Sequence, residues 1–140
     1  MRVCLTIALV FAACTPGVKT MRDETLPTCT TIAACNANDG KRIAVIGIYG
    51  MFPDQLGIDY ANIPRAVRIT LDDGIGPFLE PYWHKDAHRP EDESSKYLGK
   101  RVRVTGRYYR QQPKNPDDPP YASTIGGPCI HPVEKIELTE

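Results

Sequence analysis

The clearest pattern in the chain is the alternation of polar and apolar residues between Lys100 and Tyr109. The apolar positions are Val102, Val104 and Tyr108, and the polar positions are Arg101, Arg103, Thr105 and Arg107. Because successive side chains of a strand point to opposite faces, this period of two predicts a strand with one buried and one solvated face.

Similar local patterns predict the other strands. Residues 41–49 are apolar on both alternating faces, which is typical of a central strand. Residues 66–71 alternate again, and the Asp-Gly pair at 73–74 predicts a reversal into a short strand around 78–80. Residues 129–138 predict a last strand after a proline-rich loop.

One helix is expected between the third and fourth of these strands. Residues 90–98 begin with Pro90, continue with acidic residues and are followed by Gly99, a pattern that predicts a short helix. The resulting order of elements is that of the OB-fold, an all-β, five-stranded Greek-key barrel. The segments GKRIAVIG (40–47) and LGKRVRVTG (98–106) also resemble bacterial OB-fold domains, in which the fourth strand echoes a glycine-led first strand. The resemblance covers residues 36–140 and implies this all-β fold.

Residues 1–13 have the pattern of an export signal, with a positive charge, a short apolar stretch and small residues before Cys14. The stretch FAAC (11–14) resembles the lipobox of bacterial lipoproteins, with Phe11 where that family usually has Leu. The resemblance implies a lipid on Cys14 and an exported protein anchored on the periplasmic side of the outer membrane. The alternative is a plain secretory signal that is cut near Ala13. We expect residues 14–35 to form a flexible tether and residues 36–140 to form the domain.

The cysteines limit the disulfides of the exported chain. Beyond the predicted lipid site lie Cys29, Cys35 and Cys129, which allow at most one internal bond. We favour Cys35–Cys129, because it closes a long loop in a small domain, with Cys29–Cys129 as the alternative.

Two histidines, His84 and His88, are four residues apart, a spacing that places metal ligands on one face of a helix. No glutamate follows His84, and nothing in the sequence supports His131 or Cys129 as a third ligand, so we predict neither a metal nor another cofactor. The alternative function is a metal- or thiol-dependent periplasmic enzyme that uses His84, His88 and a free cysteine. Because no catalytic motif surrounds the thiols, we expect a protein that is not an enzyme.

Composition narrows the class of partner. The chain has 17 basic and 17 acidic residues and a net charge of zero, which argues against binding of nucleic acid through bulk charge. Arg68, Arg101, Arg103 and Arg107 with Tyr109 form a basic strip of the kind that OB-folds use for single strands. An exported chain rarely meets nucleic acid, so we expect a solvated strand face instead.

Aromatic residues gather in segments that correspond to the ligand-binding loops of OB-folds. Such residues could stack on a sugar or contact a protein, but the commoner role of aromatic residues at these positions is to plug the ends of the core. The candidate ligand-binding residues are Tyr49, Phe52, Tyr60, Arg68, Tyr82, Trp83, Arg103 and Tyr121. The sequence thus predicts a binding module for a protein, a glycan or another ligand of the cell envelope, anchored to the membrane by its N-terminal lipid.

Overall fold

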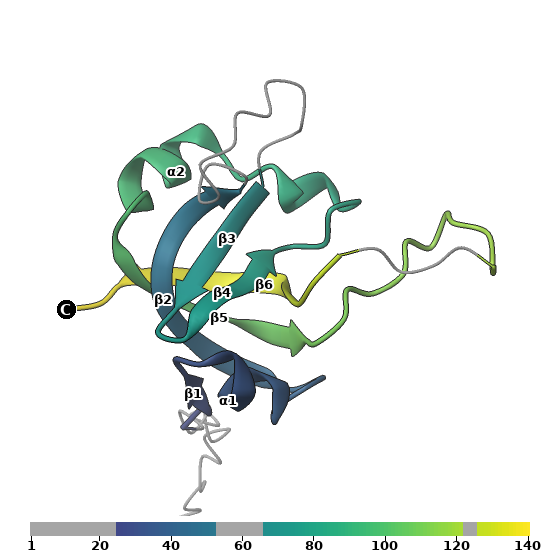
Figure 1. Cartoon of the computed structure of the whole chain (residues 1–140). Helices are drawn as coiled ribbons and strands as arrows, with labels where there is room; N and C mark the ends of the chain where they lie inside the picture. Colours follow the sequence, from purple (N-terminus) through teal and green to yellow (C-terminus); the bar gives the residue numbers. More distant parts are fainter. Residues whose placement is uncertain (1–24, 53–65, 122–125) are drawn as a thin grey trace, which may run out of the picture.

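The computed structural model describes residues 25–52, 66–121 and 126–140. Within these ranges the protein is mainly β-structure, as predicted, with one mixed sheet of six strands and only short helices (Figure 1). The elements are β1 (Thr28–Cys29), α1 (Ile32–Asn36), β2 (Arg42–Phe52), β3 (Ala66–Leu71), β4 (Gly74–Leu79), η2 (Lys85–Ala87), α2 (Glu91–Tyr97), β5 (Arg101–Tyr109) and β6 (Cys129–Leu138).

Strand β2 lies at the centre of this sheet. It pairs in parallel with β1 and antiparallel with both β3 and β5. From β3 the sheet continues to β4, then in parallel to β6, and from β6 antiparallel to β5. Each of the predicted strand segments therefore overlaps an observed strand, but the sheet has six strands instead of the predicted five, because β1 adds to β2, and its ring of pairings is not the predicted barrel. The parallel β4–β6 pair joins two parts of the chain that are distant in sequence.

The apolar faces of these strands form the core. Along one face of β2, Ile43, Val45 and Tyr49 are fully buried, whereas Ile48 on the opposite face is 37% exposed. Position 106 in β5 requires glycine, because a Cβ atom there would overlap the side chain of Ile130 and the carbonyl of Pro132. A side chain at Gly106 would therefore separate β5 from β6.

The N-terminal part of the described chain is folded, although the sequence suggested a tether up to residue 35. The side chain of Thr31 accepts a hydrogen bond from Ala34 N and caps α1, and Asp73 accepts hydrogen bonds from Ile32 N at 3.0 and 3.1 Å. Cys29 and Cys35 are buried against the sheet. Residues 28–36 thus belong to the domain, because capping and apolar burial hold a segment that lacks a strong periodic pattern.

Helix α2 falls within the range 90–98 in which a helix was predicted. Its first turn is acidic, which suits the positive end of the helix dipole. Tyr97 lies on the buried side and donates a hydrogen bond to Ile136 O at 3.0 Å, which joins the helix to β6.

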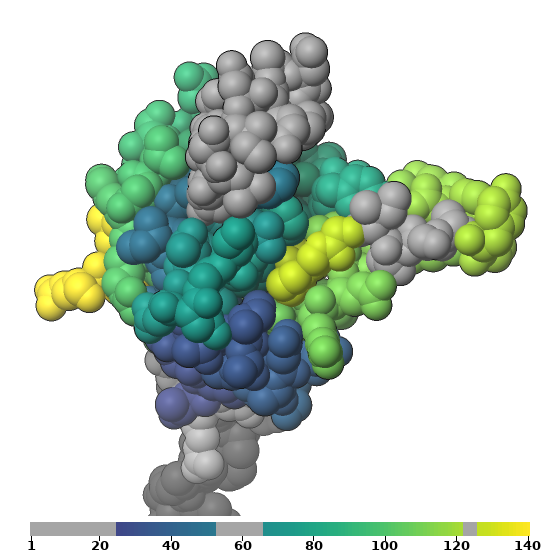
Figure 2. Space-filling view, viewed as in Figure 1, coloured from purple at the N-terminus to yellow at the C-terminus, as the bar shows by residue number. Residues whose placement is uncertain are grey.

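The chain after β5 leaves the sheet as an extended arm, residues 110–121, seen on the right of Figure 2. The base of the arm is fixed. Gln112 is buried, and its side-chain oxygen accepts a hydrogen bond from Tyr82 N at 3.0 Å. The arm is thereby held against the turn that comes after β4.

Candidate metal centre

The parallel pairing of β4 with β6 brings two polar side chains together where the pairing ends. Phe78 pairs with Cys129 and Leu79 with Ile130, and Glu80 N donates a hydrogen bond to Ile130 O at 3.0 Å. The next residues of the two segments are Glu80 and His131. The two adjoining segments, β4 and the start of β6, lie side by side on the face shown in Figure 2. This pairing places Glu80 beside His131.

Glu80 is the central residue of the site. It is 4% exposed, and its carboxylate is held at both oxygens: Oε1 accepts a hydrogen bond from Val133 N at 2.8 Å, and Oε2 contacts His131 Nδ1. Its backbone has a φ of 73°, which is uncommon for a residue with a side chain. Backbone strain of this kind is concentrated at functional sites, where the surrounding structure holds it in place.

His84 reaches the same carboxylate from the turn after β4. His84 N donates a hydrogen bond to Pro81 O at 2.9 Å, which closes the turn. The ring then lies with Nδ1 3.8 Å from Glu80 Oε2, and its centroid is 4.8 Å from that of His131. The backbone N–H of Asp86 donates to His84 Nδ1 at 3.2 Å, which orients the ring.

Glu80, His84 and His131 each offer one donor atom, and these atoms all lie within 4.8 Å of one another. Two imidazoles and a carboxylate are a donor set that binds zinc and other divalent transition metals in proteins. Donor atoms on one tetrahedral ion with bonds of about 2.1 Å are roughly 3.4 Å apart. Small rotations of the side chains would therefore bring the three donors onto one ion.

Trp83 covers one side of the two histidines. Its ring centroid is 5.7 Å from that of His84 and 6.1 Å from that of His131, and both pairs meet edge to face. Its indole N–H donates to Pro113 O at 2.8 Å, so the arm that begins after β5 fixes the ring. An aromatic wall of this kind excludes water from one side of a metal site and strengthens the electrostatic interactions within it.

A buried ionic pair lies behind the site. Arg89 Nη1 is 4.0 Å from Glu80 Oε1, and Arg89 forms a bidentate pair with Glu93 at 2.8 and 2.7 Å. The hydrogen bonds that Arg89 donates to Glu93 raise the pKa of Arg89 against the effect of burial. Tyr49 O–H donates to Glu93 Oε1 at 3.0 Å, and burial raises the pKa of this phenol. The arginine therefore stays charged and places a positive charge beside Glu80.

The sequence identified only part of this centre. His84 was one of the two histidines at helical spacing, but its partner His88 is exposed and lies along a groove with Met51 and Leu98 instead. The residues between them form only the short η2 turn, so the helical face that would unite the two histidines does not exist. His131 lacked sequence support, and Glu80 was missed. A signal for Glu80 would have required knowledge of the β4–β6 register.

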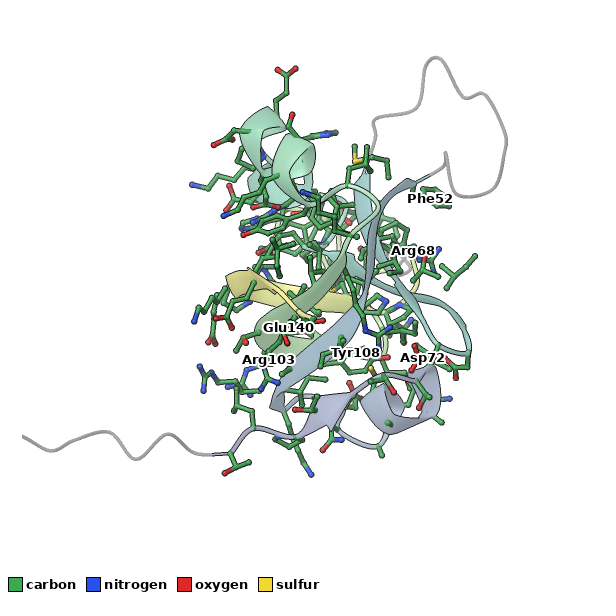
Figure 3. The ribbon with its side chains drawn as sticks, turned by 90° about the vertical axis from the view of Figure 1, so that its left-hand side faces the viewer. Phe52, Arg68, Asp72, Arg103, Tyr108 and Glu140 are labelled. Carbon is green, nitrogen blue, oxygen red and sulfur yellow. The ribbon has the colours of Figure 1, made fainter. Side chains whose placement is uncertain are left out.

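The candidate ligand-binding residues do not form a single surface. Tyr49 is fully buried against Tyr97 and offers no face to a ligand. Phe52 and Arg68 lie together on one side of the molecule in the view of Figure 3, whereas Arg103 lies on the other side, near Thr28. Tyr60 lies outside the described residues.

Arg68 contacts two aromatic rings and a backbone carbonyl of the protein itself. Its guanidinium lies 4.5 Å from the ring centroid of Phe78 and 5.7 Å from that of Phe52. Its Nε donates to Gly76 O at 2.7 Å, and burial lowers its pKa. Tyr82 and Tyr121 are the exposed aromatic residues of the predicted set, at 52% and 88%.

The predicted Cys35–Cys129 disulfide is not present. Cys29, Cys35 and Cys129 are buried free thiols, and no bond joins these described cysteines. Cys129 lies in β6, and burial together with Glu80 raises the pKa of its thiol to about 12. Cys35 lies in α1, where its neighbour is Cys29. The sequence could not distinguish the pairings, because they depend on how α1 packs. Cys14, the predicted lipid site, lies outside the described residues.

No helix in the described ranges has the length and apolar character needed to cross a bilayer. No family model, curated protein or solved structure matches this chain.

Proposed function

We propose that this chain is an exported, lipid-anchored protein of the cell envelope whose domain binds a divalent transition metal ion through Glu80, His84 and His131. The observation that carries the proposal is the convergence of one buried carboxylate and two imidazoles, with donor atoms within 4.8 Å of one another. Zn²⁺ is the ion that this mixed oxygen and nitrogen set fits best, whereas Mg²⁺ and Ca²⁺ prefer oxygen donors alone.

The surroundings of the donors also favour a metal. The Glu80 carboxylate already accepts a backbone hydrogen bond at Oε1. Partners of this type orient ligands for a metal ion.

Metal binding can be measured directly by isothermal titration of the metal-free protein with Zn²⁺ and by the visible spectrum of the Co²⁺ form. We expect one ion per chain and tetrahedral Co²⁺ bands. Glu80→Gln, His84→Ala and His131→Ala should each weaken binding by at least about tenfold, because each removes a ligand.

His88→Ala is the matched control, since His88 is an exposed histidine only four residues from His84 and lies outside the donor set. It should bind Zn²⁺ like the wild type. Absence of stoichiometric binding in the folded wild type, or equal loss in the His88 variant, would refute the proposed site.

For the fold, we propose an OB-fold-like Greek-key arrangement of β2 to β6, with β1 and α1 added at the N-terminus. Support comes from the parallel β4–β6 pair, the return of β5 to β2 and the position of α2 between β4 and β5. Nuclear Overhauser contacts between the backbone of Val45 and Val104, and between Leu79 and Ile130, would test both pairings.

The anchor is tested by the intact mass of the protein from the membrane fraction of a bacterial host. An acylated chain that begins at Cys14 is the expected result. A soluble chain that begins after Ala13 and carries no lipid would contradict the anchor and leave the metal site untouched.

A second candidate function is favoured by the number of protein donors. Three ligands leave a coordination position open to water or to a bound molecule, as in catalytic zinc sites. The exposed aromatic side chains Tyr82 and Tyr121, together with Trp83 beside the centre, would then contact a glycan or protein ligand. The test is retention of the protein on immobilised envelope glycans with and without Zn²⁺. Retention that requires Zn²⁺ and is lost in Tyr82→Ala would support this function. Retention that does not require Zn²⁺ would show that glycan binding is independent of the metal site.

A further inference from the structure

Two thiols meet on the side of the molecule that carries β1 and α1. Cys29 ends β1, and Cys35 lies in α1, six positions further along the chain. Both are buried in the same hydrophobic cluster, at 2% and 0% exposure, and Cys29 is among the groups that raise the pKa of the Cys35 thiol. This is the third of the pairings that the cysteine count allows, and no pattern in the sequence favoured it.

The local structure holds the two sulfur atoms in place. Asn38 Nδ2 donates to Cys29 Sγ at 3.8 Å and to Ala34 O at 2.9 Å, which ties the strand residue to the helix. Cys35 N donates to Thr31 O at 3.0 Å as part of the helix, and Cys29 is paired with Val45 of β2. The connecting turn is therefore fixed at both ends. Cys129 lies on another element, β6, where Glu80 is the charged group beside it.

We propose that Cys29 and Cys35 form an intrachain disulfide in an oxidising compartment, and that Cys129 stays a free thiol. The reaction needs an oxidised dithiol or a small-molecule disulfide as oxidant. One cysteine thiolate attacks the oxidant's S–S bond and releases one thiol, and the second cysteine then attacks the mixed disulfide and releases the other. Cys29 and Cys35 lose two protons and two electrons, and the oxidant's disulfide takes them up as two thiols.

The bond would fasten β1 to α1. These are the shortest strand and a five-residue helix, and the segment that precedes them leads to the predicted lipid site. A crosslink at this point would hold β1 and α1 together where the domain continues into the predicted tether, a place at which few hydrogen bonds join these two elements. This inference stands apart from metal binding, because neither cysteine belongs to the donor set.

The test uses the purified full chain, unfolded and reduced, then refolded in a glutathione redox buffer, alkylated in denaturant so that buried thiols are accessible, and digested with trypsin without reduction. Peptide 23–41 contains both Cys29 and Cys35, whereas peptide 115–135 contains Cys129. We expect peptide 23–41 to be unalkylated and about 2 Da lighter than its reduced form, and peptide 115–135 to be alkylated.

Three outcomes would overturn the inference: alkylation of both cysteines of peptide 23–41, glutathione bound to either of them, or a crosslink between peptides 23–41 and 115–135. Cys129→Ser should keep the mass loss in peptide 23–41, and Cys35→Ser should abolish it. Zn²⁺ binding measured on the same samples separates the two proposals, since failure of the disulfide should leave that binding unchanged.

Discussion

Arg89 donates two hydrogen bonds to Glu93, from Nε to Oε1 at 2.8 Å and from Nη2 to Oε2 at 2.7 Å. The side chains are only 13% and 17% exposed, so water competes little for these contacts. The pair also supports Tyr49, whose hydroxyl donates to the same carboxylate, and it brings a positive charge within 4.0 Å of Glu80. One arginine thus links the core, α2 and the metal centre.

Arg89→Lys should destabilise the domain, because a lysine cannot make the two parallel hydrogen bonds to Glu93. We expect a loss of about 1–3 kcal/mol in the free energy of unfolding, typical of a charged hydrogen bond in a shielded site. Urea unfolding followed by circular dichroism measures it. Lys96→Arg, an exposed change in α2, should have little effect, and an unchanged midpoint for Arg89→Lys would contradict this account.

Zn²⁺ should raise the thermal stability of the protein. An ion that binds only the folded state adds about 2.7 kcal/mol when its free concentration is 100 times the dissociation constant. Differential scanning calorimetry with and without Zn²⁺ should show a higher midpoint with the ion, and a chelator should reverse the shift. In Glu80→Gln the midpoint should be the same with and without Zn²⁺, while His88→Ala should respond like the wild type.

The fluorescence of Trp83 should report occupation of the site. It is the single tryptophan of the chain, and its ring lies against both His84 and His131. Cu²⁺ or Ni²⁺ in the site should quench its emission at one equivalent, because open-shell ions quench nearby indoles. His131→Ala should lose this response. Quenching that needs a large excess of metal in the wild type would show that the ion binds elsewhere.

Gly106→Ala should be strongly destabilising. A methyl group there meets the side chain of Ile130 and the carbonyl of Pro132, and the backbone cannot yield without disturbing the β5–β6 pair. Overpacking of this kind costs about 1–3 kcal/mol. Gly127→Ala is the matched control, because its added Cβ would meet the flexible end of Arg68 at an ordinary 3.6 Å. Equal unfolding midpoints for the two variants would contradict the close approach.

Stability of the reduced protein should fall in alkali. Burial, the neighbouring Cys29 and the carboxylate of Asp73 raise the pKa of Cys35 from 9.0 to about 12. Above pH 9 the unfolded chain loses this proton while the folded chain retains it, so the free energy of unfolding decreases as the pH rises toward 12. The slope from one such group is at most about 1.4 kcal/mol per pH unit.

Urea unfolding between pH 8 and pH 11 in the presence of a reductant measures this slope, and Cys35→Ala should make it shallower. Tyr108, whose pKa burial also raises, faces the same thiol and contributes to the slope that remains in the variant. If Cys35→Ala has the same pH dependence as the wild type, Cys35 is not responsible.

Local patterns were sufficient to predict the strands, because alternation along 66–71 and 100–109 depends only on which side chains face the core. They failed for β1 and α1. A two-residue strand and a five-residue helix have no measurable period, and their stability comes from Asp73 and the buried cysteines. Such tertiary support cannot be detected from one segment at a time.

The metal centre was accessible to sequence reasoning only through His84. The spacing to His88 would place both histidines on one face only if the segment were a helix, whereas the turn after β4 directs His84 toward Glu80. Glu80 itself comes after a strand and precedes a proline, a position without any metal-binding motif. Its role depends on a parallel pairing between strands that are not adjacent in sequence, and no local pattern encodes that register.

Glu80 and His131 are 51 positions apart and meet only when β4 and β6 have paired. An unfolded chain therefore presents scattered histidines and carboxylates, with no site that gathers them. Occupancy by the proposed ion would then be a measure of the folded fraction, since the site requires the completed pairing of two strands. If the chain crosses a membrane unfolded, the proposed site would form, and take up an ion, only in the compartment in which the chain folds.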